Sequence, residues 1–294
     1  MSLGDFSSLV DRKYFEIVHK SRPHKGWYER ISQCSENEKD YLIEYCFHDE
    51  VWLSFNLKAN NKLVYYAQKK SVSQETIDVI SKGAVLKLWF QINQIYALHA
   101  SGIRIGSEII LFVGPKGAGK STTVAYFGSM GYPIWCDDYC VLEKREGQFF
   151  AFPGESSVKV KNDTIEGLSL PTCHIKSLYL PEPEIESLTI PVDTFKLLYR
   201  NNVDLVGRIP LKVRSVYFLK EKGVETVIRP YNVIESLKML MKEIMIPEVV
   251  SKEYRSYYFS ESIKFLNETE SYEVHASNNL REMQVLFKSI LGRK

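Results

Sequence analysis

The first clear pattern along the chain is a set of three short segments rich in aromatic and branched residues, at 41–47, 51–57 and 63–67. The polar stretches 48–50 and 60–62 separate them. Segments of this kind, divided by turn residues, predict a small antiparallel sheet. A half-buried sheet face accounts for the aromatic side chains, and base stacking is the alternative that they leave open. The first 25 residues show no clear period and receive no assignment.

The pattern becomes helical from residue 73. Apolar positions recur at intervals of three and four residues, which predicts a helix over 73–97 that joins the N-terminal module to the rest of the chain. Gly83 inside it costs about 1 kcal/mol relative to Ala and weakens the helix at that point. The recurring positions are Ile77, Ile80, Ala84, Leu88, Gln91 and Ile95.

An uninterrupted apolar run at 109–113 predicts a strand that is buried on both faces. Gly114 ends the run, and the residues from Gly114 to Ser121 spell G-x-x-x-x-G-K-S. A helical pattern follows as far as Gly131. A strand, this loop and a helix, in that order, are the context that a phosphate-binding loop requires.

The residue types of this loop suit the binding of a nucleoside triphosphate. Glycines allow successive N–H groups to point into one concavity, and the helix N-terminus attracts phosphate. We expect Lys120 to reach the β- and γ-phosphates and the Ser121 hydroxyl to bind Mg²⁺. The predicted cofactors are therefore ATP and Mg²⁺. The predicted nucleotide contacts are Gly114, Pro115, Lys116, Gly117, Ala118, Gly119, Lys120, Ser121 and Thr122.

Two carboxylates follow the loop and its helix. Asp137 and Asp138 end the apolar segment 132–136, where side chains can face a nucleotide held by the preceding loop. One can accept a proton from a substrate hydroxyl and the other can orient Mg²⁺ or its waters. Two surface acids in a turn are the alternative. Upstream, His99 is either a structural residue or a group that touches the chemistry.

The remaining pattern predicts hairpins and then helices. Together with the strand and loop, it indicates an α/β fold with a mixed sheet, divided into a small N-terminal module at 1–72 and a nucleotide-binding catalytic domain at 73–294. A segment with two prolines and three acids, at 180–187, is predicted to be a linker or lid. The predicted strands are 140–144, 148–152 and 158–160, with a second hairpin of 213–219 and 224–228, and the predicted helices are 232–246, 254–266 and 278–291.

Composition and net charge indicate the partners and the compartment to expect. The 294 residues carry 38 basic and 36 acidic side chains, so a net charge of +2 provides no field for nucleic acid or a membrane surface. No apolar run is long enough for a membrane helix, and we expect a cytoplasmic protein, with a homo-oligomer left open. Five cysteines, an odd number, favour free thiols over disulfides or structural zinc.

Three stretches together resemble the catalytic domain of the HPr kinase/phosphorylase family. They are L-H-A-S-G at 98–102, G-P-K-G-A-G-K-S-T at 114–122 and D-D-Y-C-V-L at 137–142. The resemblance covers 75–160, with a weaker match at 210–219. It implies a PEP-carboxykinase-like core and phosphoryl transfer to a protein serine.

The resemblance also implies roles for particular residues. Lys120 and Ser121 are the phosphate and Mg²⁺ contacts, Asp137 is the general base, Asp138 is its metal-side neighbour and His99 supports the aspartate. A further acidic metal residue is expected downstream, and Glu155 is the candidate for it.

We therefore expect an Mg-ATP-dependent serine kinase that phosphorylates a peptide or small protein. Similar proteins in lasso-peptide clusters favour the C-terminal Ser of a ribosomal peptide precursor as the acceptor. The alternatives are an HPr(Ser) kinase, a kinase of free serine, a P-loop NTPase that is not a kinase, and a nucleotide-sensing module. A D-x-x-G match at 204–207 lacks the guanine motif N-K-x-D, and no L-S-G-G-Q stretch indicates an ABC-type ATPase.

Overall fold

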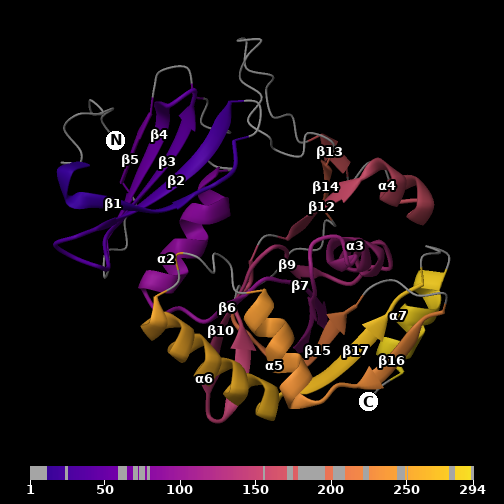
Figure 1. Cartoon of the computed structure of the whole chain (residues 1–294). Helices are drawn as coiled ribbons and strands as arrows, with labels where there is room; N and C mark the ends of the chain where they lie inside the picture. The colour runs from indigo at the N-terminus through magenta and orange to yellow at the C-terminus, as the bar shows by residue number, and fades with distance from the viewer. Residues whose placement is uncertain are drawn as a thin grey trace. The chain divides into compact units, whose positions relative to one another are not determined.

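The computed structural model divides the chain into two compact units. The first unit contains the described residues up to Ile95, with 249 and 251–255; the second contains the other described residues from Tyr96 onward. Figure 1 shows the elements of both. The structure describes residues 12–23, 26–58, 65–68, 72, 77, 80–154, 156–170, 175–177, 196–200, 209–220, 225–243, 249, 251–277 and 282–292.

The first unit is built on a five-stranded antiparallel sheet, whose strands follow one another in chain order (Figure 1). The three predicted strands are confirmed as β3, β4 and β5. Two further strands precede them in a region where the sequence shows no clear alternation, and a short 3₁₀ helix, η1, leads into the first. The bounds are η1 Arg12–Tyr14, β1 Phe15–Lys20, β2 Trp27–Cys34, β3 Tyr41–Phe47, β4 Glu50–Leu57 and β5 Tyr65–Gln68.

The predicted long helix is interrupted and ends early. A π-helical turn, η2 (Ser81–Val85), contains Gly83 in a non-helical conformation, and α2 (Leu86–Ile92) follows. Gln94 then adopts a positive φ of 51°, and the Ile95 N–H donates to the Phe90 carbonyl, which closes the helix as a Schellman motif. The extension of the helix to Ala97 was wrong. Gly usually occupies the left-handed position of this motif, so Gln gave no stop signal.

The apolar face predicted for this helical segment is nevertheless buried. Ile77, Ile80 and Leu88 belong to one core cluster with sheet residues such as Ile43 and Phe55. These helical residues, which the sequence assigned to the catalytic domain, therefore pack within the first unit. The division of the chain into domains 1–72 and 73–294 stays a prediction.

The second unit contains a nine-stranded mixed sheet, in agreement with the predicted fold class. The order is β6-β10-β11-β15-β8-β7-β9, with β17 beside β15 and β16 beside β17. β15 runs parallel to β8 and β17, and the other pairs are antiparallel. The bounds are β6 Ala97–Leu98, β7 Ala100–Ile105, β8 Glu108–Val113, β9 Ile134–Cys136, β10 Cys140–Arg145, β11 Gln148–Ala151, β15 Leu211–Leu219, β16 Val227–Pro230 and β17 Glu270–His275.

One predicted hairpin is confirmed and two are wrong. β10 and β11 pair through a turn at Glu146 and Gly147, which both have positive φ, as a type I′ turn requires. β15 and β16 do not pair, because β17 lies between them. Only Val274 of β17 is buried, so the strand lacks the alternation of apolar and polar residues that would have predicted it. β12 leaves β11 and joins a separate sheet with β14 and β13; the bounds are β12 Ser157–Lys161, β13 Ile175–Ser177 and β14 Lys196–Arg200.

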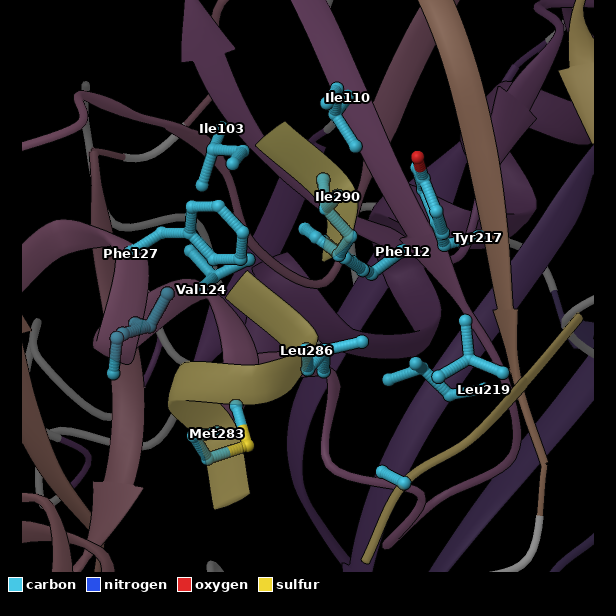
Figure 2. Packing of buried hydrophobic residues seen from close by; sticks show 14 of the residues in the cluster. Ile103, Ile110, Phe112, Val124, Phe127, Tyr217, Leu219, Met283, Leu286 and Ile290 are labelled. Atoms are coloured by element: carbon cyan, nitrogen blue, oxygen red, sulfur yellow. The ribbon is translucent and has the colours of Figure 1, made fainter. Parts of the chain in front are cut away.

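The three helices predicted at 232–246, 254–266 and 278–291 are present as α5, α6 and α7, but α5 ends at Lys242 and α7 begins at Met283. Asn232 caps α5, since its Oδ1 accepts the Glu235 N–H at 2.9 Å. Val124 and Phe127 of α3 pack with Leu286 and Ile290 of α7 in the main core of the second unit (Figure 2). Among the helices of the described residues, none has the length and apolar character to cross a bilayer. The bounds are α3 Lys120–Ser129, α4 Asn162–Leu168, α5 Val233–Lys242, α6 Lys252–Glu268 and α7 Met283–Leu291, with 252–255 of α6 in the first unit.

A buried ion pair ties two strands of the first unit. The side chain of Glu44 on β3 is 2% exposed, and its Oε2 lies 2.8 Å from Nε and 2.7 Å from Nη2 of Arg30 on β2. Arg12 Nη2 lies 2.8 Å from Oε1 without hydrogen-bond geometry, and its side chain is half exposed. Arg30 is therefore the principal partner of this buried charge.

We predict that Arg30→Met lowers the free energy of unfolding by about 3–5 kcal/mol, because it leaves a buried carboxylate without its main partner. Adding Glu44→Leu should restore most of the loss. Denaturant unfolding followed by tryptophan fluorescence measures both, since Trp27 and Trp52 lie in this sheet. The control Lys238→Met breaks a solvent-exposed pair with Glu235 and should leave stability almost unchanged, because water and salt screen such pairs. A double variant as unstable as Arg30→Met would contradict the account.

Candidate functional site

The loop between β8 and α3 contains two glycines in the left-handed region of the backbone. Gly117 and Gly119 have φ of 90° and 101°, and a Cβ at either would meet nothing within 4 Å. Gly114 is different, since its Cβ would lie 2.6 Å from the Leu219 carbonyl oxygen at the end of β15. The loop is thus anchored closely at its start and open on the side of the later glycines, where only Gly adopts this backbone without strain.

Lys120 is the first residue of α3 and is largely buried. Its Nζ donates to the Gly114 carbonyl at 2.5 Å, with the Pro115 carbonyl at 3.4 Å. The Lys120 side chain therefore reaches back across the loop, from the start of α3 to Gly114, which follows β8. This placement puts the positive charge of Lys120 against the backbone carbonyls at the start of the loop.

Asp137 is a buried carboxylate that gathers donors from three elements. Its Oδ1 accepts the Ser101 hydroxyl of β7 at 2.5 Å and the Ser121 hydroxyl of α3 at 3.2 Å. Its Oδ2 accepts the backbone N–H of Lys159 on β12 at 3.3 Å. Burial raises the pKa of Asp137, and the charge of Asp138 adds to the rise, while the three hydrogen bonds oppose it.

Asp138 is arranged differently from its neighbour. It has a φ of 63°, in the left-handed region, and its side chain is 43% exposed. Its Oδ2 lies 2.9 Å from Nζ of Lys159, whose backbone N–H serves Asp137. The left-handed residue turns the two adjacent carboxylates into different surroundings, one enclosed and one open to solvent. Lys159 contacts both.

Sequence reasoning missed Ser101 and Lys159. Ser101 lies two residues after His99, and a serine in a strand carries no functional signal by itself. Lys159 reaches the site from a separate three-stranded sheet, so only the tertiary structure could show it. His99 has its Nδ1 3.3 Å from Oε2 of Glu243, the C-cap residue of α5. The support that His99 was expected to give Asp137 stays a prediction.

The residues expected to hold a metal comprise one hydroxyl and one or two carboxylates. In the described part of the chain, no group of three or more His, Cys, Asp or Glu is arranged to hold a metal ion. Mg²⁺ is usually bound through one or two carboxylates together with substrate phosphates and water, so Ser121 and the Asp pair fit this ion. Glu155 lies outside the described residues, as do 180–187 and 204–207.

The cysteines do not suggest a metal site either. Cys34, Cys46, Cys136 and Cys140 are free and buried, as expected for reduced thiols, and Cys173 lies outside the described residues. A hydrogen bond with Cys140 and complete burial raise the pKa of Cys136. The raised pKa keeps the Cys136 thiol in its protonated form, which is a poor metal ligand.

Comparisons with known proteins add little to this geometry. No protein-family model matches the sequence, and no curated protein does. A solved structure, titled "Structure of the Hpr(Ser) kinase/phosphatase from Coxiella burnetii", aligns with 67% of this chain and 97% of its own, with 11% identity and a TM-score of 0.31. A TM-score this low supports no conclusion about function, which has to be argued from the site itself.

We predict that Asp137→Asn changes how stability depends on pH. A carboxyl whose pKa is raised in the folded state favours folding when protonated, so this group's contribution to stability falls as pH rises from its ordinary pKa through the raised one. The unfolding free energy of Asp137→Asn relative to the unsubstituted protein should therefore increase over that interval. Thermal and urea unfolding at several pH values measure it. Asp163→Asn, at an exposed position, is the control, and equal pH profiles for the two variants would contradict the prediction.

Proposed function

We propose that this protein is an Mg-ATP-dependent serine kinase. The proposal rests on the hydrogen bond of Ser121, at the start of α3, to the buried Asp137. The loop before Ser121 has the sequence G-x-x-x-x-G-K-S, and two of its glycines have positive φ. A hydroxyl and a carboxylate at this position are hard oxygen ligands, which suit Mg²⁺. Lys120 supplies the cation for the phosphates.

The contacts favour a different division of labour between the carboxylates from the one that the sequence resemblance implied. Both oxygens of Asp137 are engaged by hydroxyl and backbone donors, and the residue is only 9% exposed. Because Ser121 donates its proton to Asp137, the lone pairs of its oxygen are free to point toward Mg²⁺. Asp137 then belongs to the metal side, and the more exposed Asp138 is the better placed to reach an acceptor hydroxyl.

In the proposed phosphoryl transfer, one bond forms, one bond breaks and one proton moves. The acceptor Ser oxygen bonds to the γ-phosphorus, the bond from that phosphorus to the bridging oxygen of ADP breaks, and the hydroxyl proton passes to Asp138. Mg²⁺ supplies charge neutralisation on the phosphate oxygens when bound. Lys120 stabilises charge on the β/γ-phosphates, and Lys159 holds Asp138 in place until the acceptor arrives.

The acceptor is the part of the proposal that rests on sequence resemblance. We propose a serine in a peptide or small protein, and specifically the C-terminal Ser of a ribosomal lasso-peptide precursor. An HPr protein and free serine are the other acceptors to include in an assay. ATP binding without transfer to any of the three would instead identify a nucleotide-sensing module, and ATP hydrolysis alone would identify an NTPase.

We predict that Lys120→Ala lowers phosphoryl transfer by about 10²–10³-fold, because it removes the cation that meets charge on the phosphates. Mass spectrometry of a Ser-ending peptide incubated with Mg-ATP measures the product. Lys144→Ala, which changes a surface lysine paired with Glu268, should retain normal transfer. Near-full activity of Lys120→Ala would overturn the assignment of the loop.

A second prediction separates the two carboxylates. Asp138→Asn should keep ATP affinity within a few-fold and lower single-turnover transfer by about 10²–10⁴-fold, because it removes the base while keeping its shape. Asp137→Asn and Ser121→Ala should both raise the Mg²⁺ concentration needed for half-maximal transfer. Metal titrations beside single-turnover transfer, for all three variants, test this. If Asp137→Asn instead lowers transfer without changing the Mg²⁺ requirement, and Asp138→Asn raises that requirement, then Asp137 is the base, as the resemblance implies.

A further inference from the structure

The first unit contains a pocket that the proposed kinase chemistry does not use. It lies between the end of β2, the turn into β3, the helix α2 and the start of α6, and its empty volume is about 560 Å³, counted out to its open mouth. Every residue of its lining belongs to this one unit.

The wall of the pocket includes a buried side-chain amide with an unused acceptor. Gln91 of α2 is only 6% exposed, and its Oε1 accepts no hydrogen bond in the part of the chain that the structure describes. A buried acceptor without a donor is costly. The terminal amide torsion of Gln is soft, so a small rotation can present Oε1 to an N–H group placed in the pocket. The position therefore indicates a ligand that brings a hydrogen-bond donor.

Two hydroxyl groups in the lining can act as hydrogen-bond donors to a ligand. Tyr41 Oη accepts a hydrogen bond from Gln33 Nε2 at 3.0 Å, and Ser251 Oγ accepts one from the Tyr254 N–H at 3.1 Å. Each hydroxyl thereby keeps its own proton for donation. Burial, and then the charge of Glu38, raise the pKa of Tyr41, which keeps it a donor. The pocket thus offers an acceptor and donors together, as the peptide group requires.

The remaining lining is apolar inside and charged only at the mouth. Leu88 and Val249 are buried parts of the wall. The exposed side chains of Lys39 and Glu253 lie 4.0 Å apart and offset one another, and Gln94 Nε2 donates to Glu253 at 3.1 Å. Glu38 is also exposed, so the charged side chains of the lining all lie toward solvent. The inner wall, with Leu88, Val249 and the Gln91 amide, suits an uncharged polar group with an apolar branch.

We propose that this pocket binds a peptide group flanked by a branched apolar side chain. The ligand N–H would donate to Gln91 Oε1, its carbonyl would accept from Tyr41 or Ser251, and its side chain would contact Leu88 and Val249. The proposal is independent of the kinase function, because it concerns residues outside the phosphate loop and is tested by binding alone.

The probe is N-acetyl-leucine N-methylamide, which carries two peptide groups and one branched side chain. Saturation-transfer NMR on the full chain should show binding with a millimolar dissociation constant, as expected for a ligand of this size. Gln91→Leu should weaken binding about tenfold. The same substitution should leave thermal stability unchanged or raised, because it removes an unpartnered buried acceptor, whereas a merely structural glutamine would lose stability.

Gln148→Leu, at an exposed position on β11 in the second unit, is the matched control and should bind the probe normally. Absence of binding to the unsubstituted protein, or binding by Gln91→Leu within twofold of it, would overturn the proposal. If Gln91→Leu fails to fold, the double variant Tyr41→Phe with Ser251→Ala decides instead, because it removes both proposed hydroxyl donors of the lining. Binding by the double variant that is weakened severalfold supports the site, and unchanged binding overturns it.

Discussion

The candidate site depends on one physical constraint, the burial of an ionisable carboxylate at Asp137. A buried charge is tolerated only with good hydrogen-bond partners, and these come from β7, α3 and β12 through Ser101, Ser121 and Lys159. Each partner links a different element to the same carboxylate. The carboxylate therefore holds β7, the helix after the glycine-rich loop and the small sheet that contains β12 in a single arrangement.

The sheet order explains why this arrangement can form. β8 delivers the chain to the loop, and the parallel strand β15 lies beside it, so that Leu219 ends against Gly114. β7 runs antiparallel on the other side of β8 and places Ser101 opposite Phe112, close to the start of the loop. β9 then pairs with β7 and ends directly before Asp137. This order of strands brings Ser101, Ser121 and Asp137 close together.

The two units present different kinds of polar site. The site on the second unit concentrates charge, with adjacent carboxylates and lysines. The pocket of the first unit is lined by amides and hydroxyls around an apolar wall, and its charged side chains are exposed at the mouth. Groups of the second kind recognise neutral amides by pairing donors with acceptors rather than by attraction of opposite charges.

The sequence by itself determined the elements whose signals are local. The apolar run before Gly114, the glycine spacing of the loop, the Asn232 cap and the Glu146–Gly147 turn each depend on residues within a few positions of one another, and all are present. Tertiary structure decided what depends on partners far along the chain. β17 is a strand because β15 and β16 pair with it, and Lys159 reaches the Asp pair because β12 joins β14. Local patterning cannot show which strand a residue will lie beside, and the surroundings of the two carboxylates depend on that pairing.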